Sequence, residues 1–337
     1  MFKKKQNVCM EIKDDIIRFV ILKSIEPLVV KQYGEKMIPK GLIEGGRILN
    51  ESLFNDFLKE CVTEWNLKRK HVLFVEPDES VAIKKVAIPL EISDEEMRGY
   101  LYQALGESII LPFDEPAIDY VVLPSSEGGS AVTDSYFQTQ PEPDSSRDVL
   151  LVATPDDLVG SYSSIFRANR LEPEAVDISP LCYYRLYLDQ MKSNYLPEEI
   201  MLLQMDQLTA TISIFEKNIP IFMQYDKLFT DVQEWESDLE MATDMQARFR
   251  LLSADIERIL HFYNFSISNG KVIKEVILVG ENLFLDDLSY ELETVLNLKV
   301  NRIPETIETV DGLPIPRRYH LAIGLGLKGV DYYVSRY

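Results

Sequence analysis

Residues 8–22, VCMEIKDDIIRFVIL, read as two short apolar strands separated by a polar turn. A similar stretch, IMLLQMDQLTATISIFE, occupies residues 200–216. When the two stretches are superimposed without a gap, Glu11 coincides with Gln204, although few residues are identical. Both stretches combine an apolar strand, a polar turn and a second strand of alternating character. From this pattern alone, an internal repeat and two unrelated hairpins are both open interpretations.

Strand and helix patterns alternate along the rest of the chain. Helices are predicted where apolar residues recur at helical spacing or where a capping signal begins, at residues 51–65, 93–108, 156–170, 232–265, 286–296 and 319–328. Short apolar or β-branched runs predict strands at residues 27–38, 71–75, 81–88, 117–123, 148–153, 276–279 and 299–303. Because this alternation occurs in both halves of the chain, the sequence predicts α/β layering in each half.

The 337-residue chain is strongly acidic, with 55 Asp and Glu against 35 Lys and Arg and a formal net charge of −20. Proteins that bind nucleic acids or anionic membranes normally present a basic face. The sequence offers no obvious basic segment beyond Lys3, Lys4 and Lys5, so we expect no nucleic-acid partner. No apolar run approaches the roughly 18 residues that span a bilayer, and the N-terminus lacks the apolar stretch of a signal peptide. We therefore expect a cytoplasmic protein that does not insert into a membrane.

Motifs for catalysis or metal binding do not emerge from the sequence. Cys9, Cys61 and Cys182 are far apart and form no CxxC pair, which argues against a disulfide framework or a zinc site. The three histidines lack metal-ligand spacing, and there is no GxSxG, HExxH or Walker motif. The acidic run Asp94-Glu95-Glu96 follows Ser93 with capping-box spacing, which is typical of a first helical turn. We therefore expect no catalytic residues and no metal site.

Six segments, taken in their order along the chain, provide a more specific signal. They are KGLIEGGRI at 40–48, VAIP at 86–89 followed by DEEM at 94–97, ILPFD at 110–114 followed by DYVVL at 119–123, VDISPL at 176–181, ADIERILHFY at 254–263 and AIGLGLKG at 322–329. Together, these segments and their order resemble the PilM family of type IV pilus assembly proteins and, more distantly, the cell-division protein FtsA. The resemblance covers most of the chain.

The resemblance implies an actin-like (ribonuclease H-like) α/β fold of two halves with a nucleotide cleft between them. It also implies a small α+β subdomain inserted in the first half and a reduced second small subdomain. In the first half, residues 1–80 and 174–198 are expected to form the large subdomain, and residues 81–173 the inserted subdomain with a mobile loop at 124–147. The second half is expected at residues 199–318, with a mostly helical small subdomain at 232–265. A terminal helix is expected at residues 319–337.

Within that fold, the two hairpins correspond to the phosphate loops of the two halves. Where the family's first loop has Asp, Gly and Lys, this chain has Glu11, Lys13 and Arg18. The second loop usually reads Asp-x-Gly, and the later adenosine loop usually reads Gly-Gly-Gly. The resemblance thus assigns to a degenerate nucleotide cleft the residues Glu11, Lys13, Asp14, Arg18, Gln204, Asp206, Gly280, Glu281 and Asn282.

These departures from the family pattern are mostly unfavourable for nucleotide binding. Glycine serves such loops because backbone N–H groups must approach a phosphate with no Cβ in the way. Four carboxylates add like charge near a triphosphate in a partly desolvated cleft: Asp14, Asp15, Asp206 and Glu281. Lys13 can offset part of this repulsion and could even contact a phosphate. We expect no ATP hydrolysis, and neither ATP nor Mg²⁺ as a required cofactor.

Two functions of different classes follow from the resemblance. The favoured one is a non-catalytic scaffold of a type IV pilus-like assembly, secretion or DNA-uptake machine. It would bind the cytoplasmic N-terminal tail of a PilN-like single-span membrane protein and so stay peripheral to the inner face of the cytoplasmic membrane. A pilus assembly ATPase is a second candidate partner, and the partner-binding residues are not assigned by the sequence. The alternative function is an active actin-like ATPase of the same machine.

A third interpretation is an FtsA-like division protein. Relatives of FtsA usually end in an amphipathic membrane helix, and such helices need a long apolar face. The final segment, Asp331–Tyr337, is too short to form one. The sequence therefore favours the pilus-type family.

Overall fold

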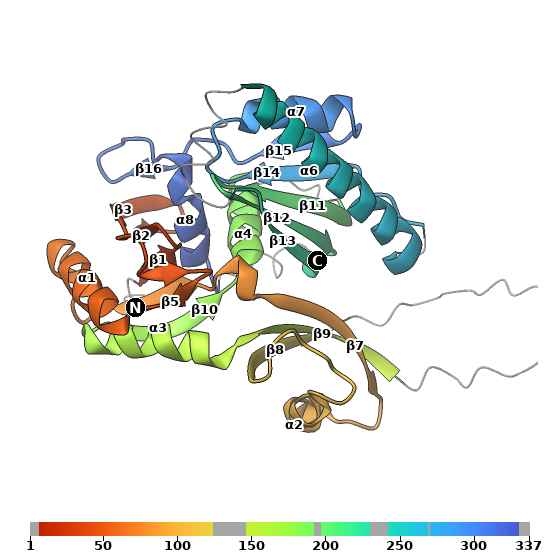
Figure 1. The fold of residues 1–337 in the computed structure, drawn as a ribbon, viewed down its shortest axis with the longest axis horizontal. Coiled ribbons are helices and arrows are strands. Elements are labelled where there is room, and N and C mark those ends of the chain that lie inside the picture. The colour runs from red at the N-terminus through yellow and green to blue at the C-terminus, as the bar shows by residue number, and fades with distance from the viewer. Residues whose placement is uncertain (1–6, 124–145, 192–196, 230–241, 269, 330–337) are drawn as a thin grey trace, which may run out of the picture. The chain divides into compact units, whose positions relative to one another are not determined.

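The computed structural model describes residues 7–123, 146–191, 197–229, 242–268 and 270–329. The chain divides into two compact units. The first combines Met1–Ser80 with Leu158–Tyr337, and the second covers Val81–Asp157. The first unit contains two large β-sheets with helices packed on them (Figure 1).

The first sheet is built from β1 (Val8–Ile12), β2 (Ile16–Ser24), β3 (Val29–Met37), β6 (His71–Val75), β10 (Glu172–Asp177) and β16 (Glu308–Thr309). Their order is β10-β6-β1-β2-β3-β16. Strand β2 is antiparallel to β1 and β3, whereas β1, β6 and β10 run parallel to one another. Nearly every residue of β1, β2 and β6 is buried, because both faces of the sheet are covered.

The second sheet repeats this arrangement. Its strands are β11 (Glu199–Met205), β12 (Thr209–Glu216), β13 (Ile219–Lys227), β14 (Glu275–Val279) and β15 (Lys299–Arg302). Their order is β13-β12-β11-β14-β15, with β12 antiparallel to both neighbours and with β11, β14 and β15 parallel. Setting β16 aside, the two sheets have the same strand order and the same strand directions.

The repeat extends to the pairing register of the two hairpins. Glu11 lies opposite Arg18 in the β1–β2 hairpin. At the same place in the β11–β12 hairpin, Gln204 lies opposite Thr211. Superimposing the two sequence stretches without a gap aligns these same pairs. The two hairpins are therefore an internal repeat and not unrelated segments.

Helices cover the outer face of each sheet. They are α1 (Glu51–Glu64) and α3 (Asp156–Ala168) on the first sheet, and α6 (Ala242–Phe262) and α7 (Leu285–Thr294) on the second. Helix α1 begins after Asn50, whose side chain accepts a hydrogen bond from the Leu53 N–H. Phe54 of α1 and Phe166 of α3 are fully buried in one cluster with Phe74 of β6. Each outer helix thus buries one apolar stripe, as its sequence pattern predicts.

Two further helices join the halves of the first unit. Helix α4 (Ser179–Met191) packs against α8 (His320–Gly326), and α8 also contacts β1, β2 and β6. Tyr184 of α4 stacks on Phe215 of β12 with ring centroids 4.2 Å apart. A Cβ on Gly324 would overlap the carbonyl oxygen of Cys182, so the two helices approach as closely as glycine allows. A single buried cluster therefore contains residues from both sheets.

The second unit is a three-stranded antiparallel sheet with one helix. Its elements are β7 (Ala82–Pro89), α2 (Asp94–Ala104), β8 (Pro116–Val122) and β9 (Ser146–Pro155), and β9 is the central strand. The predicted capping box is present: Ser93 and Glu96 each accept a hydrogen bond from the other's backbone N–H. Met97 and Leu101 of α2 pack with Ile88 in a core of this unit's own.

The inserted subdomain predicted at 81–173 is longer than the second unit, which ends at Asp157. From Leu158 onward, the apolar stripe of α3 joins the core of the first sheet, so this helix belongs to the first unit. The mobile loop predicted at 124–147 lies outside the described residues except for its last two, which open β9.

Several short elements complete the described structure. Strands β4 (Ile43–Glu44) and β5 (Arg47–Ile48) form a small hairpin, and single turns occur at η1 (Asp78–Ser80), η2 (Tyr263–Ile267) and η3 (Arg317–Tyr319). Within the ranges that the structure describes, no helix is both long enough and apolar enough to cross a membrane.

We predict that Gly324→Ala destabilises the protein by about 1–3 kcal/mol, because the added Cβ forces α8 away from the Cys182 carbonyl. The measurement is the free energy of unfolding in urea. Gly160→Ala in α3 is a matched control, since nothing lies within 4 Å of its Cβ position, and it should stabilise by about 0.5–1 kcal/mol. Equal effects of the two substitutions would contradict this account of the helix contact.

Candidate functional site

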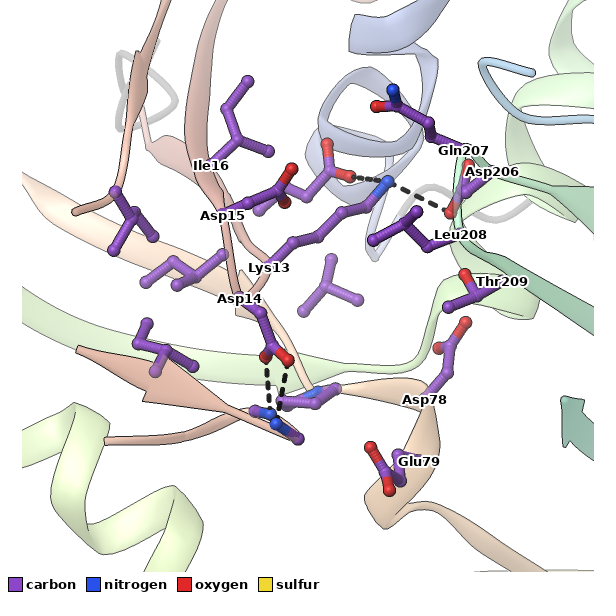
Figure 2. A pocket seen from close by; sticks show the side chains of 18 of the residues that line it. Lys13, Asp14, Asp15, Ile16, Asp78, Glu79, Asp206, Gln207, Leu208 and Thr209 are labelled. Atoms are coloured by element: carbon purple, nitrogen blue, oxygen red, sulfur yellow. Dashed lines mark hydrogen bonds and ion pairs between the residues drawn. The ribbon is translucent and has the colours of Figure 1, made fainter. Parts of the chain in front are cut away.

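The turns of the two hairpins and the carboxyl ends of neighbouring strands line one cavity of about 600 Å³. Figure 2 shows Lys13 from the first turn extending toward Asp206 in the second. Gly280 and Asn282 flank Glu281 in the turn after β14. The remaining seven predicted cleft residues line the cavity directly: Glu11, Lys13, Asp14, Arg18, Gln204, Asp206 and Glu281.

In each hairpin turn, the first backbone N–H donates a hydrogen bond to a carbonyl oxygen of the same turn. The Lys13 N–H donates to the Ile16 carbonyl oxygen at 2.9 Å. The Asp206 N–H donates in the same way to the Thr209 carbonyl oxygen, also at 2.9 Å. These amides close tight turns and are not available to a ligand in the cavity.

The ammonium group of Lys13 is surrounded by carboxylates from both halves of the first unit. Its Nζ lies 2.7 Å from Glu281 Oε1 and 3.0 Å from Asp206 Oδ2. A third carboxylate oxygen, Glu11 Oε1, lies 3.1 Å away. Burial by itself would lower the pKa of Lys13, but the three carboxylates outweigh it and raise that pKa well above its ordinary value. Lys13 is therefore a fixed cation.

Arg18 is the second cation of the site and is almost fully buried. Its guanidinium donates two hydrogen bonds to the Glu281 carboxylate, at 3.1 and 2.6 Å. Its Nε donates to Glu35 at 3.0 Å, and Glu11 Oε1 lies 3.5 Å from one terminal nitrogen. Burial opposes the charged form, but Glu11 and Glu281 raise the pKa of Arg18. The paired, planar contact with Glu281 is the strong geometry for an arginine and a carboxylate.

Glu281 therefore lies between the two cations and contacts both. Burial alone would raise its pKa, but Lys13 and Arg18 lower the pKa of Glu281 to about 2. The pKa of Glu11 moves the other way: burial raises it more than the same two cations lower it. We call the whole group the ionic cluster; its members are Lys13, Arg18, Glu11, Glu35, Asp206 and Glu281.

Asp206 is fixed from the second half of the unit. Its Oδ2 also accepts a hydrogen bond from Gln204 Nε2 at 2.7 Å, and its carbonyl oxygen accepts one from Asn282 Nδ2 at 2.9 Å. Gly280 has a φ of +106°, and a Cβ there would overlap the backbone of Met205. Gly280 is thus required for the turn after β14 to approach β11.

Asp14 does not join the ionic cluster. Its two carboxylate oxygens each accept a backbone hydrogen bond at 2.8 Å, from the N–H groups of Gly45 and Gly46. Figure 2 shows the side chain pointing to these amides. The Tyr162 hydroxyl donates to the Gly46 carbonyl oxygen at 2.7 Å, which holds the same small hairpin on α3. Asp14 therefore anchors the β4–β5 hairpin at the rim of the cavity.

Asp78 is a cavity residue that the sequence patterns did not single out. Its Oδ2 accepts hydrogen bonds from Ser179 Oγ at 2.8 Å and Thr211 Oγ1 at 2.9 Å. Burial raises the pKa of Asp78 to about 6, against the opposing effect of these two hydroxyls. Its place just after β6 was the available signal, because polar residues at the carboxyl ends of parallel strands commonly line a site.

Metal ligands are not grouped in this cavity. Among the residues that the structure describes, no three His, Cys, Asp or Glu side chains are placed to hold a metal ion. Its carboxylates are instead distributed over contacts to Lys13, Arg18, backbone amides and hydroxyls.

Comparisons with known proteins place this geometry in context. The sequence matches the family of Type IV pilus assembly protein PilM over residues 10–233. No curated protein sequence matches the chain significantly. The structure superposes with a TM-score of 0.74 on one described as a PilM–PilN type IV pilus biogenesis complex, at 16% identity, covering 98% of this chain and 100% of that one.

Two other solved structures show weaker similarity. One is a Bacteroides thetaiotaomicron protein with an actin-like ATPase fold and unknown function, at 12% identity and a TM-score of 0.47, covering 96% of each chain. The other is the ethanolamine utilization protein EutJ from Carboxydothermus hydrogenoformans, at 11% identity and a TM-score of 0.49, covering 97% of this chain and 91% of that one.

Two α/β sheets of the same topology, joined by a shared helical core and bordering one cavity, define an actin-like protein. The fold class predicted from the sequence is thus confirmed. The family match covers well over half of the chain, so the protein belongs to the PilM family of type IV pilus assembly proteins.

We predict that Glu281→Gln destabilises the protein by about 2–4 kcal/mol at pH 7, because it leaves the buried Arg18 and the partly buried Lys13 with fewer partners. A carboxyl whose pKa falls from 4.5 to about 2 on folding stabilises the fold above pH 4.5 and loses that contribution between pH 4.5 and 2. The stability difference between the unaltered protein and the variant should therefore shrink across this window.

Urea unfolding at a series of pH values measures this difference. The exposed Glu305 has no ion-pair partner among the described residues, so Glu305→Gln is the control and should change stability by less than about 0.5 kcal/mol. A Glu281→Gln variant as stable as the unaltered protein at pH 7 would show that the ionic cluster does not stabilise the fold.

Proposed function

We propose that this chain is a non-catalytic scaffold of a type IV pilus machine, held at the inner face of the cytoplasmic membrane by a membrane-protein partner. The observation that carries the proposal is the ionic cluster. Glu281 already binds Lys13 and Arg18, the two cations that a phosphate group would need. The cations of this cleft are then already paired with the protein's own carboxylates.

A triphosphate fits these residues poorly. Its phosphates would have to displace the Glu281 carboxylate from Lys13 and Arg18. The displaced carboxylate would stay close to the phosphates, as would the buried Asp206 and Glu11, and like charges repel strongly where water is partly excluded. One backbone amide in each hairpin turn, that of Lys13 and that of Asp206, is engaged in a turn hydrogen bond and does not point at an anion. The proposal therefore includes neither ATP nor Mg²⁺ as a cofactor.

The partner that we propose is the cytoplasmic tail of a PilN-like single-span membrane protein. Two findings support it: the chain belongs to the PilM family, and its fold superposes on a structure described as a PilM–PilN complex. Such a tail would keep the scaffold in the cytoplasm, beside the membrane. A pilus assembly ATPase remains a second candidate partner.

One observation favours the alternative of an active ATPase. The cavity has a volume of about 600 Å³, which lies within the usual range of small-molecule sites. Volume alone does not select a ligand, because the charges that line a cavity decide which ions enter it. The two functions are separated by a nucleotide titration and by a peptide titration.

In a titration with a fluorescent ATP analogue and Mg²⁺, we expect no saturation below about 1 mM. Glu281→Gln removes the competing carboxylate and leaves Lys13 and Arg18 in place, so it should raise the affinity at least about tenfold. Glu305→Gln serves again as the control. Saturation of the unaltered protein below about 100 µM, abolished by Lys13→Gln, would favour the ATPase instead.

A synthetic peptide of the N-terminal tail of the organism's own PilN-like protein should bind with a Kd of about 10 µM or tighter without nucleotide. Calorimetry measures this affinity, and a scrambled peptide is the control. Addition of ATP with Mg²⁺ should leave the Kd unchanged, because the proposed scaffold does not need nucleotide to present its binding surface. No binding, or binding only with ATP, would contradict the proposal.

A further inference from the structure

A second, smaller cavity lies at the opposite end of β6 from the ionic cluster. It has a volume of about 340 Å³ and belongs to the first unit. Three arginines line it, namely Arg69, Arg167 and Arg170, together with Leu171 and Glu172. We call this cavity the arginine pocket.

The fold brings these arginines together from segments that are distant in sequence. Arg69 lies in the loop before β6, and Arg170 lies in the loop before β10, the parallel neighbour of β6. The Arg69 N–H donates to the Arg170 carbonyl oxygen at 2.7 Å, and the Glu172 N–H donates to the Lys70 carbonyl oxygen at 3.0 Å. Arg167 lies in the last turn of α3, just before this loop. The two loops are thus fixed to each other by backbone hydrogen bonds.

The guanidinium groups of the arginine pocket have no acidic partner among the described residues. Glu172, the carboxylate in the pocket, lies 3.4 Å from His71 Nε2 instead. Other arginines of the chain, such as Arg18 and Arg147, make ion pairs with carboxylates. The three arginines are exposed, so without a carboxylate partner they leave a local excess of positive charge that is accessible from solvent.

Backbone conformation points the same way. Arg69 and Arg170 have φ values of 65° and 61°, in the left-handed region where glycine and asparagine are more favourable. Neither position therefore favours arginine for reasons of local structure. Lys68 and Lys70 flank Arg69 in sequence, which adds to the local positive charge. The result is a compact basic site on an acidic protein.

We propose that the arginine pocket binds a phosphate group. Planar guanidinium groups match phosphate oxygens with paired hydrogen bonds, and several of them around one cavity can replace much of the hydration of a doubly charged anion. Bound phosphate also removes the repulsion among the three arginines. A duplex nucleic acid would need a longer basic track than one small pocket provides. The phosphate comes either from a lipid headgroup or from a small soluble compound.

This site is independent of the proposed scaffold function, because the pocket shares no lining residue with the larger cavity. If the source is a lipid headgroup, the pocket gives the protein a second contact with the membrane and fixes which surface faces it. If the source is a soluble phosphate compound, the pocket binds that compound at the end of β6 opposite the ionic cluster.

The test compares the full-length protein with the triple variant Arg69→Gln, Arg167→Gln and Arg170→Gln. The first probe is inorganic phosphate and pyrophosphate, measured by calorimetry at 0.15 M salt. We expect a Kd of about 1 mM or tighter for the unaltered protein, and at least tenfold weaker binding for the triple variant. The control triple variant Lys23→Gln, Lys59→Gln and Arg250→Gln removes the same charge from exposed positions elsewhere and should bind as the unaltered protein does.

The second probe distinguishes the two sources. Vesicles of phosphatidylcholine with and without about one-third phosphatidylglycerol are sedimented with each protein, under the same salt. Co-sedimentation with the anionic vesicles that is lost only in the arginine variant supports a lipid source, whether or not free phosphate binds. Binding of phosphate or pyrophosphate without co-sedimentation supports a soluble source.

Three results would overturn the proposal. One is binding of neither probe by the unaltered protein. Another is equal binding by the unaltered protein and the arginine variant. The last is a duplex DNA affinity that exceeds both and depends on the same arginines. Thermal melting checks that each variant is folded. If the triple variant does not fold, the single variant Arg170→Gln replaces it, and we expect this variant to bind phosphate about threefold more weakly or worse.

Discussion

The contact of one carboxylate, Glu281, with the two cations Lys13 and Arg18 is the interaction on which the cleft depends. It links the turn after β14, in the second half, to the β1–β2 hairpin of the first half. Removing any one of these charges from water without a partner of opposite charge would cost free energy. The charged forms are favourable because each carboxylate and each cation contacts a group of opposite charge. The low pKa of Glu281 and the raised pKa of Lys13 are two expressions of this one arrangement.

The duplicated fold explains why this contact can form. Two hairpins with the same register place their turns at one cavity, and the close-packed helices α4 and α8 hold the two sheets on one core. A fold that commonly presents backbone amides to phosphate here presents side chains that satisfy one another. The ion pairs occupy the cations that line the cleft, which is consistent with the proposed scaffold function.

Much of the fold and part of the site could be predicted from the sequence. Periodicity located α1, and Ser93 with Glu96 indicated the start of α2. The role of Asp14 was harder to foresee, because its partners Gly45 and Gly46 are about thirty residues away and meet it only through the fold. The positions of the motifs thus indicated which residues border the cleft. They did not indicate which carboxylate pairs with which cation, because that depends on distances in the folded protein.

The charged residues show the same difference between what the sequence determines and what the structure decides. The sequence by itself determined the composition, the alternation of strands and helices in both halves and the absence of glycine at the two hairpin turns, since these are local properties of neighbouring residues. Its short basic run Lys68-Arg69-Lys70 does not by itself indicate a binding site. Only the tertiary structure placed Arg69 beside Arg167 and Arg170, and Glu281 between Lys13 and Arg18. Electrostatic interactions act through space over a few ångströms, so their outcome is decided by the packing of strands that are distant in the chain.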